Sequence, residues 1–174
     1  MTLAGFVAPF PEALRILLVP VHLTYPMRLA CASFVVRAYG GNLAFGSALY
    51  RRRPEGPFVL VGELGRSNVA ELEEGDTGIR AVDHRRAQGA LPMPRTQSFY
   101  VALQVGTDFA STEFYSMLSG YGPHSAVWAQ GLAPRFGDWP HELAARTDER
   151  PSALPYLVLR SAKGMRLFGD PTTV

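Results

Sequence analysis

The chain is 174 residues long, which is the size of one domain with a substantial buried core. A hydrophobic content of 47% and a charged content of 18% are those of a globular protein and exclude an intrinsically disordered one. The formal net charge is only +2, so we expect no nucleic-acid partner. No apolar run approaches the roughly 18 residues of a membrane span, so we expect no membrane insertion. No signal-peptide pattern is present, so we expect the protein to be made in a cytoplasm.

Residues 1–12 are predicted to form an extended N-terminal arm ahead of the folded domain. Phe6, Val7 and Phe10 make this arm apolar, and such an arm is disordered unless something ties it down. The surface that receives these side chains is either the chain's own sheet or a neighbouring subunit. We therefore take the three residues as candidates for an assembly contact.

Three β-rich runs and the turns between them are the clearest structural signal in the chain. Gly40-Gly41 joins Leu29–Ala38 to Leu43–Tyr50, and paired glycines are typical of a tight hairpin. A second turn, rich in proline and glycine, then leads into Phe58–Leu64. These signals predict a β-meander, in which each run pairs with the next one.

Further strands are predicted on both sides of this meander. Leu14–Val21 precedes it, and Ile79–Arg86, Ser98–Val105 and Leu154–Ser161 follow it, while Glu113–Leu118 is either a strand or a short turn of helix. Side chains alternate most regularly in the run SFYVALQV. We expect Phe99, Val101, Leu103 and Val105 to lie on one face of the sheet and Tyr100 and Ala102 on the other.

About eight strands and little helix predict an all-β protein. Only residues 141–150 have helical propensity, and residues 87–96 are predicted to form a loop. Parallel strands need crossover connections, usually helices, that this chain lacks. We therefore predict an antiparallel β-sandwich, jelly-roll-like, over residues 13–162, followed by a C-terminal tail over residues 163–174.

The sequence contains no recognisable catalytic or metal-binding motif. The histidines have no metal-ligand spacing, and neither a nucleophile elbow nor a phosphate-binding loop is present. The lone Cys31 lies in an apolar run and is predicted to be a buried, inert thiol. No two carboxylates can be paired for glycoside hydrolysis. We therefore expect no metal, no cofactor and no enzymatic activity.

An aromatic-rich stretch between residues 120 and 139 is the best candidate for binding, because long connections in compact domains are often functional. Its side chains could cap an open end of the sandwich, form a subunit interface or stack on a glycan. Phe114 and Tyr115, shortly before this stretch, are grouped with it, and the candidate residues for a ligand or an interface are Tyr121, Trp128, Phe136 and Trp139.

The strand sequences also carry a resemblance that extends over residues 25–160. The relevant segments begin with Tyr25-Pro26-Met27-Arg28-Leu29, continue with Ala48-Leu49-Tyr50 and Gly56-Pro57-Phe58-Val59-Leu60-Val61-Gly62-Glu63-Leu64-Gly65, and end with Ser98-Phe99-Tyr100-Val101-Ala102-Leu103 and Leu154-Pro155-Tyr156-Leu157-Val158-Leu159-Arg160. In this order they resemble the β-sandwich domains of tailed-bacteriophage virion proteins, especially tail-fibre and appendage proteins. One departure is Gln97-Ser98, which replaces the usual glycine before the aromatic strand.

The resemblance implies a virion structural protein that acts by assembly and binding. Its expected partners are other virion proteins and further copies of itself, with a trimer favoured, and its expected location is the virion, assembled in the host cytoplasm. The family has no shared catalytic residues to transfer. The alternative is a carbohydrate-binding module that recognises a host-surface glycan.

Overall fold

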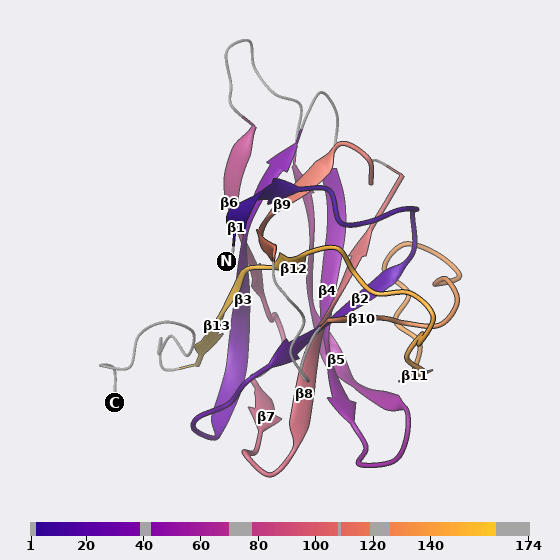
Figure 1. The fold of residues 1–174 in the computed structure, drawn as a ribbon. Coiled ribbons are helices and arrows are strands. Elements are labelled where there is room, and N and C mark those ends of the chain that lie inside the picture. The colour runs from indigo at the N-terminus through magenta and orange to yellow at the C-terminus, as the bar shows by residue number, and fades with distance from the viewer. Residues whose placement is uncertain (1–2, 39–42, 70–77, 108, 119–125, 163–174) are drawn as a thin grey trace.

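The computed structural model describes residues 3–38, 43–69, 78–107, 109–118 and 126–162. These residues form strands, turns and irregular segments, with no helix among them. The strands build two antiparallel sheets that pack face to face (Figure 1). The predicted all-β class and the antiparallel β-sandwich are thereby confirmed.

Sheet A, the seven-stranded sheet, is organised around the long central strand β3 (Met27–Ala38). Strand β1 (Leu3–Val7) pairs with β9 (Thr112–Leu118), which pairs with one end of β3. The remaining strands of sheet A are β6 (Ile79–Arg85), β7 (Leu91–Met93) and β13 (Leu157–Ser161), which pair with β3, and β12 (Leu154–Pro155), which pairs with β9.

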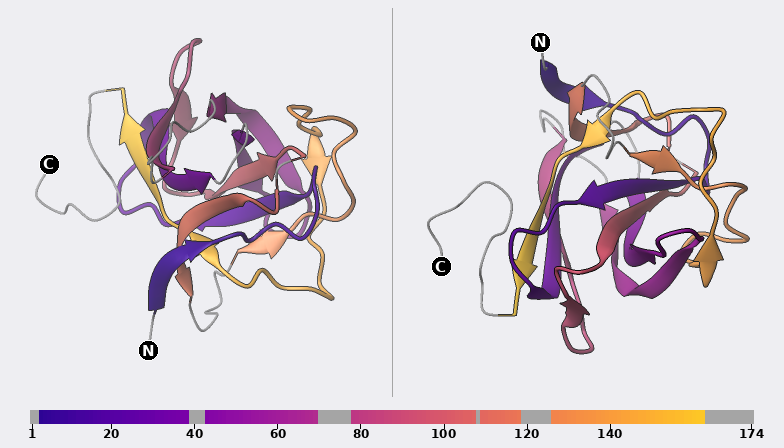
Figure 2. Two further views of the ribbon diagram at one scale, coloured as in Figure 1. Left: turned by 90° about the horizontal axis from the view of Figure 1, so that it is seen from above. Right: turned by 60° about the horizontal axis from the view of Figure 1, so that its bottom comes forward.

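Sheet B has six strands and curls until its two edges meet (Figure 2). Two backbone hydrogen bonds join these edges, from the amide of Gln130 to the carbonyl of Ala144 at 2.8 Å and from the amide of Arg146 to the carbonyl of Trp128 at 2.7 Å. The strands run in the order β10 (Val127–Trp128), β2 (Ile16–Val21), β8 (Ser98–Val105), β4 (Leu43–Arg52), β5 (Phe58–Val69) and β11 (Glu142–Leu143).

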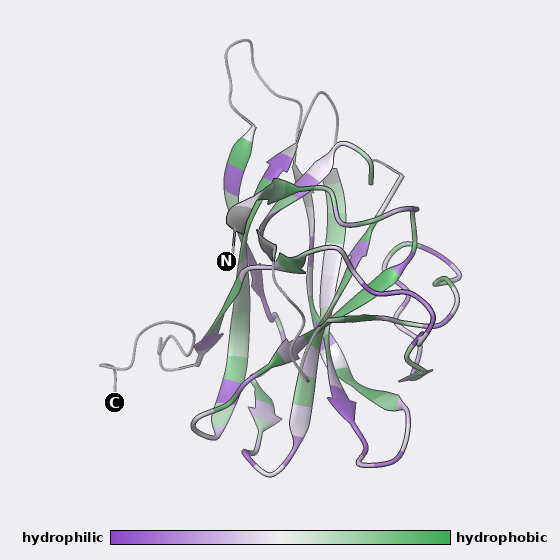
Figure 3. Ribbon diagram, in the orientation of Figure 1, coloured by the Kyte–Doolittle hydropathy of each residue, from purple (hydrophilic) through white to green (hydrophobic). Residues whose placement is uncertain are grey.

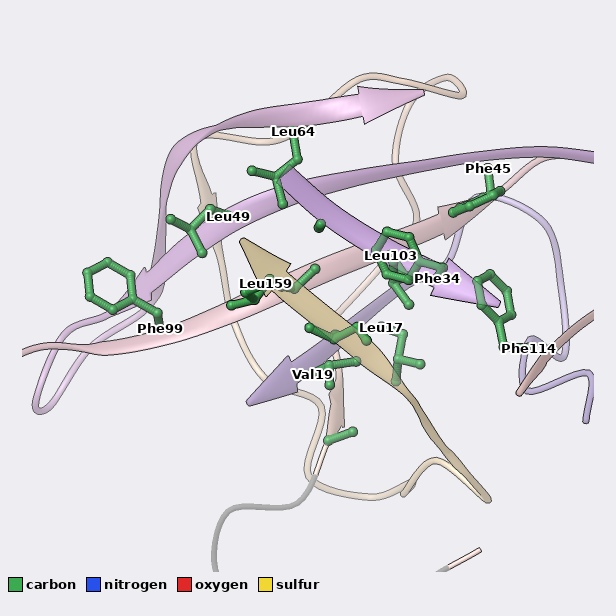
Figure 4. Close-up of a cluster of buried hydrophobic side chains, with 14 of the residues drawn as sticks. Leu17, Val19, Phe34, Phe45, Leu49, Leu64, Phe99, Leu103, Phe114 and Leu159 are labelled. Atoms are coloured by element: carbon green, nitrogen blue, oxygen red, sulfur yellow. The ribbon is translucent and has the colours of Figure 1, made fainter. Parts of the chain in front are cut away.

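The alternation predicted for residues 98–105 is confirmed, and both faces of β8 are buried. Phe99, Val101, Leu103 and Val105 point into the main core between the sheets, where side chains from sheet A meet those from sheet B (Figure 4). Tyr100 and Ala102 point into a second core, which is enclosed by the curl of sheet B. The apolar segments in Figure 3 accordingly follow strands of both sheets. We refer to the second cluster as the curl core.

The meander is correct in its second half and wrong in its first. Strands β4 and β5 pair with each other, and the amide of Arg53 donates to the carbonyl of Pro57 across their turn. Strand β3, however, lies in sheet A, and in the described part of the chain it pairs with no strand of sheet B. A turn signal encodes a reversal of the chain and not the sheet that the next strand joins. Gly40-Gly41 lies outside the described residues.

Two further predictions need correction. Residues 141–150, which have helical propensity, contain β11, because Leu143 is buried in the curl core and the backbone pairs with β5. Residues 87–96, predicted as a loop, contain β7, whose Leu91 and Met93 are buried in the main core. In both segments burial of apolar side chains decides the backbone conformation against the local sequence signal.

The N-terminal arm belongs to the folded domain. Strand β1 pairs with β9 of the same chain over five residues. Phe10 is 3% exposed and packs against the rings of Phe114 and Trp128. Of the two surfaces considered for the arm, the chain's own sheet is therefore the one used.

Candidate interaction surface

Sheet A has one face on the main core and one face directed away from it, which we call the outer face. Along β3, Phe34 and Val36 are buried, whereas Val35 and Arg37 are partly exposed. Residues that pair across strands share a face, so Glu113, opposite Arg37, also lies on the outer face. The strand alternation of period two thus sorts one sheet into a core side and a side that can meet a partner.

Three aromatic side chains lie next to one another on the outer face. Phe6 on β1 is paired with Tyr115 on β9, and their ring centroids are 5.5 Å apart at 66°. Tyr156, between β12 and β13, lies on the other side of Tyr115 at 6.3 Å and 82°. Tyr156 is 39% exposed. We call Phe6, Tyr115 and Tyr156 the aromatic row.

An ion pair between Arg37 and Glu113 lies beside Phe6 of the aromatic row. The Arg37 guanidinium lies 4.7 Å from the centroid of the Phe6 ring, and its Nε donates to Glu113 Oε2 at 2.7 Å. The two side chains are only 29% and 20% exposed. Since both the cation and the carboxylate are partly shielded from water, this pair fixes the position of Arg37 over the ring better than a fully exposed pair would.

The orientation of the rings favours a protein partner over a sugar. A flat platform for a sugar needs aromatic faces that lie in one plane, whereas neighbouring rings in the aromatic row are steeply inclined to each other. Tyrosine, phenylalanine and arginine are the residue types enriched at the centres of protein interfaces. The aromatic row with Arg37 therefore has the composition of a protein-binding site.

The other half of the outer face is polar and internally paired. Ser33 Oγ donates to Asp83 at 2.5 Å, and Arg85 and Arg160 approach the same carboxylate at 3.2 and 3.4 Å. The hydrogen bond from Ser33, supported by the two guanidinium groups, holds the pKa of Asp83 below its usual value. Beside this group Cys31 is 4% exposed, in accordance with a buried thiol.

Trp128 is not available as a ligand-stacking residue, which corrects its prediction. It is 1% exposed, with the Phe10 ring 5.5 Å away and the Arg15 guanidinium 4.7 Å from its ring centroid. Arg15 is itself buried and makes two hydrogen bonds to Glu149, at 2.9 and 2.5 Å. A Trp128→Ala variant would open the core, so it is no test of glycan binding.

The two other described members of the predicted aromatic site lie on the segment that covers the curl core. Trp139 is partly buried against that core, and its ring lies over Gly46 of β4. The segment is tied down nearby, because the Tyr50 hydroxyl donates to the carbonyl of Pro140 at 2.7 Å. Phe136 is half-buried. Of the three interpretations of the aromatic stretch, capping of the sandwich is thus the one with structural support. Tyr121 lies outside the described residues.

The predicted arm residues divide between two faces. Phe6 belongs to the aromatic row, whereas Val7 pairs with Phe114, whose side chain is in the main core. Phe10 is in the main core as well. Of the three candidates for an assembly contact, the structure therefore presents Phe6 on a surface that another molecule can reach.

A buried histidine links the two sheets. His84 of β6 is 1% exposed, and its ring nitrogens lie 2.6 Å from Ser47 Oγ on β4 and 2.8 Å from Ser67 Oγ on β5. Burial lowers the pKa of His84 to about 4, against the opposing effect of Glu63 and Asp83. A serine beside a histidine is also the arrangement of a nucleophile and its base. Here the ring is enclosed by the main core, and we assign it a structural role.

Metal-binding and membrane-spanning features are not found in the described ranges. Within them, no group of three or more His, Cys, Asp and Glu side chains is placed to hold a metal ion. Likewise, no helix in this part of the chain has the length and apolar character needed to cross a membrane.

Sequence reasoning missed most of the outer-face site. Tyr115 was noted only as part of an aromatic-rich region, and Arg37 and Tyr156 were not singled out. One signal is present in the sequence, since Arg37 occupies the outward phase of a strand whose alternate positions are apolar, and Tyr156 stands between buried residues of an apolar run. Their proximity is not, because it depends on the pairing of β3, β9 and β12 over large separations in sequence.

Comparisons of the chain with protein-family models, with curated proteins and with solved structures found no match. The geometry of the outer face and the resemblance of the strand sequences are therefore the two observations that bear on function.

Proposed function

We propose that the chain is a structural protein of a tailed-bacteriophage virion that acts by binding and assembly through the outer face of sheet A. The observation that carries the binding role is the aromatic row with Arg37 and Glu113 on one open face of a sandwich. The setting in the virion comes from the resemblance of the strand sequences to phage appendage domains.

The composition of the face supports a protein partner. Interface centres are rich in Tyr, Phe and Arg, and a few such residues supply most of the binding free energy. Tyr156, at 39% exposure, still has surface to bury, and the Arg37–Glu113 pair has already lost much of its contact with water. Binding therefore costs little further desolvation of charge at this end of the aromatic row.

The first experiment is immunogold labelling of purified phage particles whose genome encodes the chain. We expect specific labelling of the particle. The second is incorporation of variants: Tyr156→Ala should lower the affinity for the particle component about tenfold or more, because an exposed aromatic anchor is lost without disturbing a core.

Tyr25 provides a matched control for this experiment. It is 56% exposed and does not belong to the aromatic row, so Tyr25→Ala removes the same side chain at another place on the surface. Equal incorporation of the two variants would contradict a role for the aromatic row. Particles that carry no trace of the chain would contradict the virion assignment itself.

A further inference from the structure

The sandwich protects nearly all of its strand edges in the described part of the chain. The two edges of sheet B are joined to each other near Ala129 and Ala145. In sheet A, β6 carries three charged residues, β7 and β12 are short and contain proline, and β13 has a charged residue next to a register irregularity. Charges, prolines, short strands and bulges are the devices that stop sheet edges from pairing with other chains.

Strand β1 is the exception. Its five residues, LAGFV, include no charge and no proline, and its register with β9 has no irregularity. It lies at the end of sheet A and pairs only with β9 among the described strands. Within the described residues, its second edge is therefore an unprotected template for a further strand.

We infer that this edge pairs with the same edge of a second copy of the chain. The inference rests on the proposed function, to which it adds a second copy of the chain that brings two aromatic rows together. An antiparallel register centred on Gly5 pairs all five residues of β1 with their counterparts, and any shift leaves residues unpaired. Two uncharged strands meet without the repulsion that like charges would impose on a self-pairing. The result is an isologous two-fold dimer with one continuous sheet.

The dimer extends the aromatic row across the two-fold axis. In the centred register Phe6 of one copy lies opposite position 4 of the other, so the two Phe6 residues are diagonal neighbours on the outer face. The aromatic rows of both copies then join into one. Pairing of β1 with itself uses both copies of the edge, so the assembly is complete at two copies. A ring of three copies would instead have to pair β1 with one of the protected edges. We therefore infer a dimer and not the trimer that the resemblance favours.

Gly5 is the best position for testing this pairing, because in the centred register it lies at the two-fold axis. A Cβ atom added there would meet nothing within 4 Å, so the single chain has room for the first atom of a side chain, and circular dichroism checks that the longer variants fold. In the dimer, however, position 5 lies directly opposite its own copy. Gly5→Glu and Gly5→Lys therefore each place two like charges face to face.

Sedimentation equilibrium of the full chain measures the outcome. We expect a concentration-dependent dimer for the unaltered chain and a dissociation constant raised about tenfold or more by either substitution, which corresponds to about 1.4 kcal/mol. Mixing the two variants should restore the dimer, because opposite charges then face each other. Leu132→Glu, at a 53% exposed apolar residue of another segment, should leave the dimer unchanged.

Three results would overturn the inference. They are a monomer at every accessible concentration, a mass of three copies, and a dimer that Gly5→Glu and Gly5→Lys leave intact while circular dichroism shows both folded. If the chain is a monomer and its Tyr156→Ala variant still fails to enter the particle, the β1 dimer is wrong but the proposed function stands. If the chain is a dimer and that variant enters the particle normally, the β1 dimer stands but the proposed role of the aromatic row is wrong.

Discussion

Single buried polar residues determine how the two sheets are held together. His84 is the strongest case, because it reaches from β6 of sheet A to serines on β4 and β5 of sheet B at 2.6 and 2.8 Å. Its ring also packs against Phe34 and Phe45 of the main core, at centroid distances of 5.2 and 4.5 Å. A polar group in this position stabilises the fold only while it is neutral and both of its nitrogens have partners.

The pH dependence of stability follows from this residue. In the unfolded chain His84 titrates near 6.5, whereas in the folded chain its pKa is about 4, so the unfolded state takes up a proton first as the pH falls. The contribution of His84 is thus present above pH 6.5 and is lost between pH 6.5 and 4, by on the order of 3 kcal/mol. Denaturant unfolding at a series of pH values measures it.

The control for this prediction is His84→Gln, which cannot titrate in that range. The variant is expected to be less stable at neutral pH but to lose much less free energy of unfolding between pH 6.5 and 4. Parallel pH profiles for the two proteins would show that another group causes the acid sensitivity. Asp83, Asp148 and Glu149 also have lowered pKa values, but their contributions are lost mainly at lower pH.

Among the structural elements, the segment from β10 to β11 gives sheet B its second core. It crosses the curl and joins both sheet edges by backbone hydrogen bonds. Trp139 seals it against β4 at Gly46, where an added Cβ atom would lie 3.3 Å from Cζ2 of the indole. The absence of a side chain at Gly46 therefore allows the indole to approach the strand closely.

Substitution of Gly46 tests this contact. We expect Gly46→Ala to be mildly destabilising and Gly46→Val to lower the free energy of unfolding by about 1–3 kcal/mol, because the larger side chain pushes the indole away. Thermal and denaturant unfolding measure both. In a Trp139→Ala background the cost of Gly46→Val should largely disappear, and a cost that persists unchanged would mean that Trp139 is not the obstacle.

The elements themselves were largely predictable from the sequence, whereas their partners were not. Alternation along residues 98–105 placed Phe99 and Tyr100 on opposite faces, as the structure confirms. The same local signal could not indicate that β3 and β4 join different sheets, since that choice depends on pairing with strands 40 or more residues away along the chain. Residues 141–150 show the converse, because burial of Leu143 overrides a helical preference.

The candidate site was less predictable than the fold for the same reason. Phe6 was selected from the sequence because an apolar arm needs a surface, and the structure gives it that surface on β9. Arg37 on β3 and Tyr156 between β12 and β13 join it from segments that are far apart in the sequence. Trp128 was selected for its residue type alone, and type does not distinguish a binding residue from a core residue.

In the whole molecule the two sheets differ: sheet B closes on itself, whereas sheet A has a face that a partner can reach. Sheet B surrounds its own core and joins its edges, so its surfaces are used within the chain. Among the described residues, sheet A presents the aromatic row on an open face and, at β1, one unprotected edge. In the virion role that we propose, many copies would add the strength that a small contact lacks alone.

Hydroxyl-radical footprinting can compare the outer face of sheet A in the free chain and in the assembled chain. We expect oxidation of Phe6, Tyr115 and Tyr156 to fall several-fold on assembly, since these rings are then covered, while oxidation of the 56% exposed Tyr25 does not change. Equal oxidation of Tyr156 in the free and the assembled chain would contradict the role that we propose for this face.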